Sequence, residues 1–316
     1  MQALLDAVAT MAPFTDATDA QRLFHGRGGL FPGCEHLALD VFPPVLLLTA
    51  FKPLDEAALA TVGEALAARF GDTLNWVYQC RGEGAETRLM AGTVPEPHIV
   101  TEAGTRYLVH LLRGQNHGLF LDMAEGRRWV REHVKPGNKV LNLFAYTCAF
   151  SVVALQAGAS EVVNVDMASG ALATGRTNHE LNGVKAGAKF LAHDIFNSWG
   201  KLTRGGPYDL VVCDPPSFQK GSFVATKDYA RLARRLPALL TPGGYALLCL
   251  NAPELGVEFL RGVVTENAPG LEFVERVANP AVFADVSPDR GLKVVAYRLR
   301  EGEPVPSAAY PLPPDR

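Results

Sequence analysis

The chain lacks paired cysteines. Its five cysteines are widely spaced, odd in number and without a CxxC pair: Cys34, Cys80, Cys148, Cys213 and Cys249. This pattern argues against a disulfide framework and against a zinc site, so we expect no bound metal. Free thiols fit a reducing compartment, and we expect a cytoplasmic protein.

Long apolar runs and a basic leader are also missing. Residues 1–19 hold three acidic side chains and no basic one, and no apolar run reaches membrane-spanning length. We therefore expect neither a secretory signal nor a membrane association. The formal net charge of -3 and the pI near 6.3 supply no overall basic field. A nucleic-acid partner would have to meet a local basic patch.

What the chain does have is enough apolar sequence for a large core. With 316 residues, 48% of them hydrophobic, two domains are expected. From Asn138 onward apolar runs alternate with amphipathic stretches, which is typical of a parallel sheet covered by helices. The expected strands are 138–144, 161–166, 188–194, 208–214 and 244–251, and the expected helices are 149–159, 170–183, 227–240 and 253–267. Segments 271–279 and 292–300 could close the sheet as an antiparallel pair.

Three regions follow from this pattern. Residues 1–103 form a small α+β domain, with strands at 37–41 and 44–51 and an amphipathic helix at 54–70. Residues 104–301 form the larger α/β domain. Residues 302–316 are a proline-rich tail, which we expect to be extended or disordered.

The first strand-to-helix turn, "VLNLFAYTCAFS" (140–151), lacks the glycines of a dinucleotide-binding loop. Phe144, Tyr146 and Cys148 stand where such a loop is glycine-rich, which argues against NAD. Asp166 ends the second strand, 24 positions after Asn142. An acid that binds ribose hydroxyls in doubly wound folds lies at an offset of about 20. A ribose without a pyrophosphate fits both observations.

The ends of the third and fourth strands extend this pattern. His193 and Asp194 end the third, where a carboxylate can accept a hydrogen bond from an adenine amino group. Adenosine without phosphate suggests S-adenosylmethionine, although acids at strand ends also cap helices. After the fourth strand, the prolines of "DPPSF" stiffen a turn that holds the Asp214 carboxylate, and Phe218 could stack on a base. The alternative is a rigid turn with a core phenylalanine.

These motifs resemble a known family. "NLFAYTCAFSVVALQAGASEVVNVDMA", "LAHDIF", "VVCDPPSF" and "NHGLFLDMAEGR" are similar to the class I S-adenosylmethionine-dependent methyltransferases that modify bacterial large-subunit ribosomal RNA. The resemblance covers residues 105–300. It implies S-adenosylmethionine as cofactor and ribosomal RNA as partner. It also implies a Rossmann-like domain with a mostly parallel seven-stranded sheet and helices on both faces.

The resemblance also implies which residues contact the cofactor. They are Phe120, Asp122, Arg127, Asn142, Phe144, Tyr146, Thr147, Asp166, Met167, His193, Asp194 and Asp214. Cys148 stands where the family usually has glycine, and we expect it to narrow the turn. For the segment "FLDMAEGR" the alternative is a strand and a helix cap with a solvated Arg127.

The positions of the cysteines indicate which atom of the base accepts the methyl group. Relatives that methylate a cytosine carbon use a cysteine after the fifth strand, and that position falls on Asn251 here. Cys249 and Cys213 lie within strands and are interpreted as buried apolar residues. We therefore expect a purine nitrogen, guanine in preference, as acceptor. Asp214 would accept a hydrogen bond from the base, helped by the Pro215 carbonyl, stacking on Phe218 and a contact from Asn251.

Candidate RNA contacts are fewer. "GRRWVREHVK" (126–135) and "RLARR" (231–235) are either basic patches or solvated helix faces. "RLFHGRGG" (22–29), with His25 and Arg27, is either a flexible anion-gripping loop or a turn. A methyltransferase acting on a small molecule or protein remains an alternative. So does a noncatalytic adenosine-binding module in ribosome assembly, while an NAD-dependent oxidoreductase ranks lowest. The oligomeric state stays open.

Overall fold

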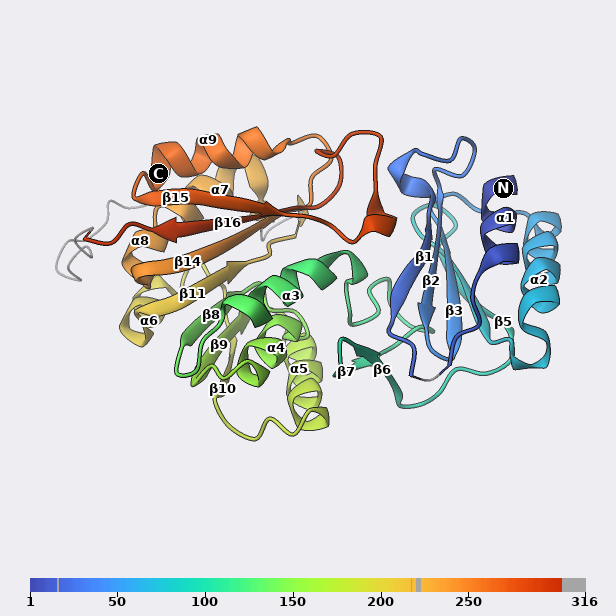
Figure 1. The fold of residues 1–316 in the computed structure, drawn as a ribbon, viewed down its shortest axis with the longest axis horizontal. Coiled ribbons are helices and arrows are strands. Elements are labelled where there is room, and N and C mark those ends of the chain that lie inside the picture. The colour runs from blue at the N-terminus through green and yellow to red at the C-terminus, as the bar shows by residue number, and fades with distance from the viewer. Residues whose placement is uncertain (16, 217, 220–222, 303–316) are drawn as a thin grey trace. The chain divides into compact units, whose positions relative to one another are not determined.

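The computed structural model describes residues 1–302 except 16, 217 and 220–222, and it leaves the side chains of Phe218 and Gln219 undescribed. The described chain divides into two compact units (Figure 1). The first comprises Met1–Ala124 and Pro280–Pro288, and the second comprises Glu125–Asn279 and the residues from Asp289 onward. The proline-rich tail from residue 303 onward lies outside the described residues.

The first unit is a five-stranded sheet with two helices on it. Its elements are α1 (Gln2–Thr10), β1 (Gln21–His25), β2 (Leu37–Phe42), β3 (Val45–Ala50), α2 (Glu56–Phe70), β4 (Trp76–Cys80), β5 (Glu86–Ala91), and a separate hairpin of β6 (His98–Glu102) and β7 (Thr105–Val109). The strands lie in chain order, and only β3 and β4 are parallel. Leu4 and Val8 of α1 share a core with Leu59, Val62 and Leu66 of α2.

The β6–β7 hairpin explains why the first unit extends beyond the boundary expected at 103–104. The carboxylate of Asp19 accepts hydrogen bonds from the Thr101 hydroxyl and the Ala103 N–H, which ties the hairpin to the start of β1. Ala103 and Gly104 both have positive φ angles, of 47° and 78°. They form the hairpin's tight turn, so the turn signal marks a point inside the unit and not its end.

The second unit contains the expected doubly wound sheet. Its strands lie in the order β10-β9-β8-β11-β14-β16-β15, with β16 antiparallel to both neighbours and the first five strands parallel. The bounds are β8 (Lys139–Leu143), β9 (Glu161–Asp166), β10 (Ala188–Ala192), β11 (Tyr208–Cys213), β14 (Leu240–Leu250), β15 (Leu271–Val277) and β16 (Lys293–Leu299). The Rossmann-like class and the antiparallel closing pair are confirmed.

Helices cover both faces of this sheet. They are α3 (Ala124–His133), α4 (Ala149–Gln156), α5 (Ser169–Leu181), α6 (Trp199–Gly205), α7 (Ala225–Ala233), α8 (Leu236–Leu239) and α9 (Val257–Asn267). The helix expected over 227–240, in which Pro237 predicts a kink, is divided into α7 and α8. Pro237 lies in the first turn of α8, where its missing N–H costs no hydrogen bond. A short hairpin, β12 (Phe218–Gln219) with β13 (Phe223–Val224), precedes α7.

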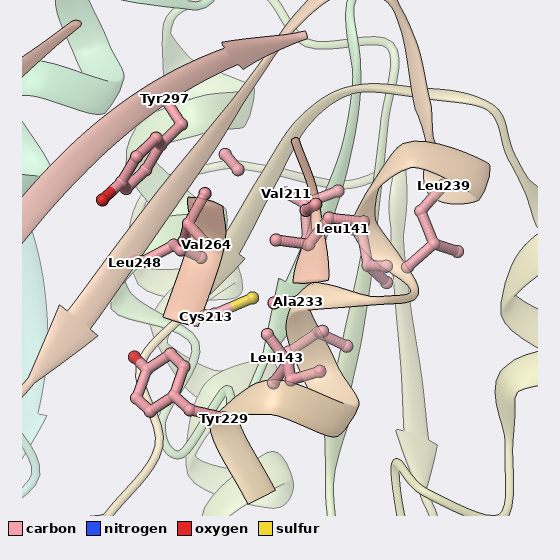
Figure 2. Close-up of a cluster of buried hydrophobic side chains, with 14 of the residues drawn as sticks. Leu141, Leu143, Val211, Cys213, Tyr229, Ala233, Leu239, Leu248, Val264 and Tyr297 are labelled. Carbon is pink, nitrogen blue, oxygen red and sulfur yellow. The ribbon is translucent and has the colours of Figure 1, made fainter. Parts of the chain in front are cut away.

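The larger core lies between the sheet and helices α6 to α9 (Figure 2). Cys213 at the end of β11 lies among Leu143, Tyr229 and Ala233 and is completely buried. Adjacent strand residues point to opposite faces, so Asn142 and Asn164 face α4 and α5 instead. No helix within the described residues is long and apolar enough to cross a membrane.

Candidate functional site

The carboxyl ends of four parallel strands meet at one edge of the second unit's sheet. Their last paired residues are Ala192 with Asp166, Val165 with Leu143, and Leu143 with Cys213. The segments beginning at Phe144, Asp166, His193 and Asp214 therefore leave the sheet together. The Asp214 N–H donates to the Leu143 carbonyl at 3.4 Å. This contact places the Asp-Pro-Pro turn beside the turn after β8.

The turn after β8 holds three non-glycine residues in the left-handed region. Phe144, Tyr146 and Cys148 have φ angles of 58°, 48° and 61°. Each such residue costs about 1 to 3 kcal/mol and persists only where its surroundings impose it. Two backbone hydrogen bonds do so: Cys148 N–H to Ala145 O at 2.7 Å, and Ala145 N–H to Val165 O at 3.0 Å. Backbone hydrogen bonds therefore fix the conformation of this turn although it contains no glycine.

The carboxylate of Asp166 supports this turn from β9. Its Oδ2 accepts the Tyr146 N–H at 2.8 Å, and its Oδ1 accepts the Ala168 N–H at 2.8 Å, at the start of α5. Each carboxylate oxygen keeps a second lone pair, and the side chain is only half-buried. The two interpretations of Asp166, as helix cap and as ribose ligand, are therefore compatible.

A pocket of about 440 Å³ includes Met167, the residue that follows Asp166. It is lined by Met167, Asp194, Phe196, Asn197, Phe223, Val224, Lys227, Asp228 and Arg231. Asp194 is oriented by the Phe196 N–H at 2.9 Å and the Asn197 side-chain amide at 2.6 Å. Apolar walls with a few fixed polar groups suit a flat heteroaromatic ring. The sequence motifs indicated Met167 and Asp194, but not the aromatic walls Phe196 and Phe223.

These strand-end features coincide with a family match. Residues 21–298 match the model of the family described as S-adenosylmethionine-dependent methyltransferases. The chain belongs to this family. Its cofactor is S-adenosylmethionine, as the resemblance implied.

Individual relatives extend the comparison. A protein of Erwinia tasmaniensis, "Ribosomal RNA large subunit methyltransferase I", is 31% identical over 289 residues, which cover 84% of this chain and 70% of the relative. A "Ribosomal RNA large subunit methyltransferase" of Deinococcus radiodurans is 32% identical and covers 77% and 62%. The relative from Aeromonas salmonicida is 36% identical over 170 residues. The match spans only 42% of that relative's length.

A solved structure with the same fold includes the reaction product of the cofactor. SMU.776, described as a methyltransferase complexed with SAH, is 26% identical. It superposes with a TM-score of 0.81, covering 90% of this chain and 76% of the other. The strand-end residues here fit such a ligand. Asp166 offers two free acceptor sites for ribose hydroxyls, the pocket offers space for adenine, and the glycine-poor turn suits a ligand without a pyrophosphate.

Phe223 of β13 joins the turn after β8 to helix α7 through its ring. Phe223 is 1% exposed and packs edge-on against Phe144 at 5.4 Å and Tyr229 at 5.5 Å between ring centroids. Asp214 is half-buried and Pro215 buried, while Asn251 is exposed after β14. The backbone of Phe218 lies in β12, and its predicted stacking side chain lies outside the described residues.

The thiols of the methyltransferase are all internal. Each of the five cysteines is buried. Burial, reinforced by the neighbouring Asp214, raises the pKa of the Cys213 thiol. A buried thiol with a raised pKa is a poor nucleophile, which supports the interpretation of Cys213 and Cys249 as core residues.

The side chain of Cys148, which was expected to narrow the turn, points into the interior of the unit. Its side chain is completely buried in a small cluster with Ala145 and Leu172. Its Sγ faces Gly175 of α5, because a Cβ added there would lie 2.5 Å from the sulfur. The thiol fills the interior beneath the turn.

Other predicted cofactor contacts divide between the units. Arg127 of α3 is 3% exposed, so the solvated alternative is wrong for this side chain. Asn142 is buried and donates its amide to Asn164 at 2.9 Å. His193 is exposed, with its ring 3.2 Å from the Lys201 ammonium. Phe120 and Asp122 belong to the first unit. Their cofactor contacts, and that of Thr147, stay predictions.

The glycine-rich segment 22–29 is packed rather than flexible. A Cβ on Gly26 would lie 1.8 Å from the Cys34 carbonyl oxygen, and one on Gly28 would lie 2.0 Å from that of Ala284. Burial, followed by the charges of nearby arginines, lowers the pKa of His25 to about 4. The hypothesis of a flexible anion-gripping loop is therefore wrong, because the glycines serve close backbone packing.

In both candidate basic patches, arginine side chains already contact neighbouring carboxylates or aromatic rings. Arg128 pairs with Glu125 at 2.6 Å. Arg231 pairs with Asp228 at 3.0 Å and lies 4.3 Å above the ring of Phe196. The solvated or packed alternative fits these arginines better than a free phosphate-binding patch. Lys227, at the pocket rim, is an exposed cation that the sequence motifs did not indicate.

Proposed function

We propose that this methyltransferase acts on a base nitrogen of ribosomal RNA, with guanine as the favoured base. The observation that carries the proposal is the Asp214-Pro215-Pro216 turn, joined to the end of β8 by the Asp214 N–H, in a protein whose thiols are all buried. The relatives described as ribosomal RNA large subunit methyltransferases support the substrate class.

On the cofactor side, this chain's residues bind and orient. Asp166 would accept the ribose hydroxyls while keeping the Tyr146 N–H in place, and Asp194 and Met167 would border the adenine. The left-handed turn from Phe144 to Cys148 would hold the amino-acid end. S-adenosylmethionine, when bound, supplies an electrophilic methyl group.

On the acceptor side, this chain's residues would orient the base so that the lone pair of its nitrogen points at the methyl group. The Asp214 carboxylate would accept a hydrogen bond from the base's amino or imino group, and the Pro215 carbonyl and Asn251 would orient the base edge. A ring or exocyclic nitrogen would then attack the methyl carbon in line, without a covalent enzyme intermediate. The methyl–sulfur bond would break as the new bond forms, SAH would leave, and the proton lost from the nitrogen would pass to the Asp214 carboxylate to which it is hydrogen-bonded. Correct positioning supplies much of the barrier reduction in such a step. The stiff proline turn serves this purpose.

A cytosine-carbon acceptor fits less well, because that chemistry requires a thiolate in the base pocket. Cys213 and Cys249 are both buried, and Asn251 occupies the exposed strand end. A small-molecule or protein acceptor has one observation in its favour. The arginines of both candidate RNA patches are engaged by neighbouring side chains, as Arg128 and Arg231 show.

The test is transfer of radiolabelled methyl to ribosomal RNA from a strain lacking this protein, with Asp214→Ala and Asp214→Asn beside the wild type. We expect label in large-subunit RNA with the wild type. For Asp214→Ala we expect a loss of about 100-fold or more, typical of removing a group that orients the reacting atom. Calorimetric titration with SAH separates the two predicted roles of Asp214: a Kd within about threefold of wild type assigns the carboxylate to the acceptor, and a rise in Kd that matches the loss of label assigns it to the cofactor. Cofactor binding without label in any RNA would contradict the proposed substrate.

A further inference from the structure

Helix α5 supports the cofactor turn from below through one buried face. Asn178 is completely buried and donates its side-chain amide to the Thr147 carbonyl at 3.0 Å. Gly175, one turn earlier, lies under Cys148. Residues three and four apart share a helix face, so both contacts come from the same surface of α5.

The glycine at position 175 is required by space and not by backbone conformation. A Cβ there would lie 2.5 Å from Cys148 Sγ, 3.0 Å from Cys148 Cβ and 3.3 Å from the Thr147 carbonyl oxygen. Glycine is disfavoured in the interior of a helix, so its presence in α5 asks for a packing reason. The packing reason is the Cys148 thiol, which occupies the space that a side chain at position 175 would fill.

We propose that Gly175 and Asn178 are positioning residues that hold the turn in its cofactor-binding conformation, with Gly175 and Cys148 a size-matched pair. The inference rests on the proposed placement of the cofactor at this turn. Three consecutive residues of the turn each have a different support. The Tyr146 N–H donates to Asp166 and the Thr147 carbonyl accepts from Asn178. The Cys148 side chain packs into the space that Gly175 leaves open. A left-handed turn without glycine needs this degree of support.

The experiment is calorimetric titration of SAH into the full chain, for Gly175→Ala, Cys148→Gly and the double variant. Gly175→Ala should weaken binding by about tenfold or more, because the methyl group displaces Cys148 and with it the turn. Cys148→Gly should weaken binding less than Gly175→Ala does, because glycine adopts the positive φ of this position readily but leaves the space above Gly175 unfilled. The double variant should recover most of the affinity, because the sulfur and Cβ that obstruct the new methyl are gone. Recovery distinguishes a size-matched pair from a general loss of stability.

Gly262→Ala is the matched control. Gly262 lies in α9, and a Cβ there meets nothing within 4 Å, so SAH affinity should not change. Should Gly175→Ala fail to fold, Asn178→Ala decides: losing one hydrogen bond to the turn should weaken SAH binding by about fivefold. Wild-type affinity in a folded Gly175→Ala, or in Asn178→Ala, would overturn the inference. Wild-type affinity in Asp166→Ala would instead overturn the placement of the cofactor.

Discussion

Asp166 connects the end of β9 to the turn after β8 through a single carboxylate. Its two oxygens accept the N–H groups of Tyr146 and Ala168, and each keeps a lone pair for a ligand. The same residue therefore braces the turn and is proposed to bind the ribose. A helix cap and a ligand are often treated as alternatives, but the geometry of Asp166 is compatible with both roles.

Replacing Asp166 with alanine should raise the Kd for SAH by at least about 50-fold. Charged hydrogen bonds are worth about 1.5 to 3 kcal/mol each, and both ribose contacts and the Tyr146 brace are lost. Asp55→Ala is the control, because Asp55 also accepts a backbone N–H, from Ala58 at the start of α2. It should lower stability by about 1 kcal/mol and leave calorimetric SAH binding unchanged. Equal SAH affinity in the two variants would contradict the assignment.

The buried thiols allow a second prediction at this scale. Cys213→Ala and Cys249→Ala should each keep at least about a third of the wild-type rate of methyl transfer, since neither thiol attacks the acceptor. Each should lower stability by about 1 kcal/mol through lost packing. Steady-state kinetics and urea unfolding check both statements. If a folded variant lost methyl-transfer rate by orders of magnitude, the result would contradict the prediction and support a cysteine nucleophile acting on a cytosine carbon.

At the scale of elements, a buried polar chain joins the strands β8 and β9 to the helices α4 and α5. His179 Nδ1 donates to the Gly175 carbonyl at 2.6 Å, which leaves Nε2 to accept the Ser151 hydroxyl at 2.8 Å. Asn164 donates to Ser151 Oγ at 3.0 Å and accepts from Asn142. Burial lowers the pKa of His179, consistent with the neutral ring that this chain requires.

Ser151→Ala should therefore lower the free energy of unfolding of the second unit by about 2 to 3 kcal/mol. The substitution leaves the His179 Nε2 acceptor and one Asn164 N–H buried without partners. Ser160→Ala is the matched control, because that hydroxyl is exposed and bonds only backbone carbonyls. Its effect should stay within about 0.5 kcal/mol in urea unfolding. A similar loss of stability in both variants would mean that the buried hydrogen-bond network contributes no more to stability than an exposed hydroxyl does.

The elements themselves were predictable where periodicity is strong. The strands 161–166 and 208–214 are short, valine-rich and mostly apolar, and both appear as β9 and β11 within one residue. The segments after Asp166 and Asp214 converge because parallel strands end at one edge. Phe196 and Phe223 were not found, because an aromatic residue in a pocket wall has the same sequence pattern as one in a core. The pairing of Cys148 with Gly175 depends on contacts that no local pattern contains.

At the scale of the whole molecule, turn chemistry was the weakest guide. The Ala103–Gly104 turn suggested a boundary but closes a hairpin, and the glycines of segment 22–29 suggested mobility but serve packing. The compact units divide at Ala124 instead, and the second unit's sequence is interrupted by Pro280–Pro288 of the first. An insertion of nine residues between two strands of another unit carries no local signal.

Acid should destabilise the whole chain, beginning near neutral pH. Burial is the main cause of a lowered pKa in six histidines, namely His25, His36, His98, His110, His117 and His179. The unfolded chain, with an ordinary pKa of about 6.5, then binds more protons than the folded one. Stability should fall as the pH drops below about 6.5, and for His25 the loss continues to its folded pKa of about 4.

Urea unfolding at pH 7.5 and pH 5 measures this loss. The contribution of His25 alone is at most about 2 kcal/mol over that range, and less because the ring is partly exposed. His25→Gln should therefore show a shallower dependence on pH than the wild type. Equal slopes for the two proteins would contradict the assignment of His25.

The measurement closest to the central claim is nucleoside analysis of the labelled RNA. Large-subunit ribosomal RNA from a strain lacking this protein is incubated with the wild type and methyl-labelled S-adenosylmethionine, digested, and separated by chromatography with mass detection. The account predicts label in an N-methylated purine, guanosine in preference, and almost none with Asp214→Ala. Label in a carbon-methylated cytidine, or in no nucleoside at all, would contradict it.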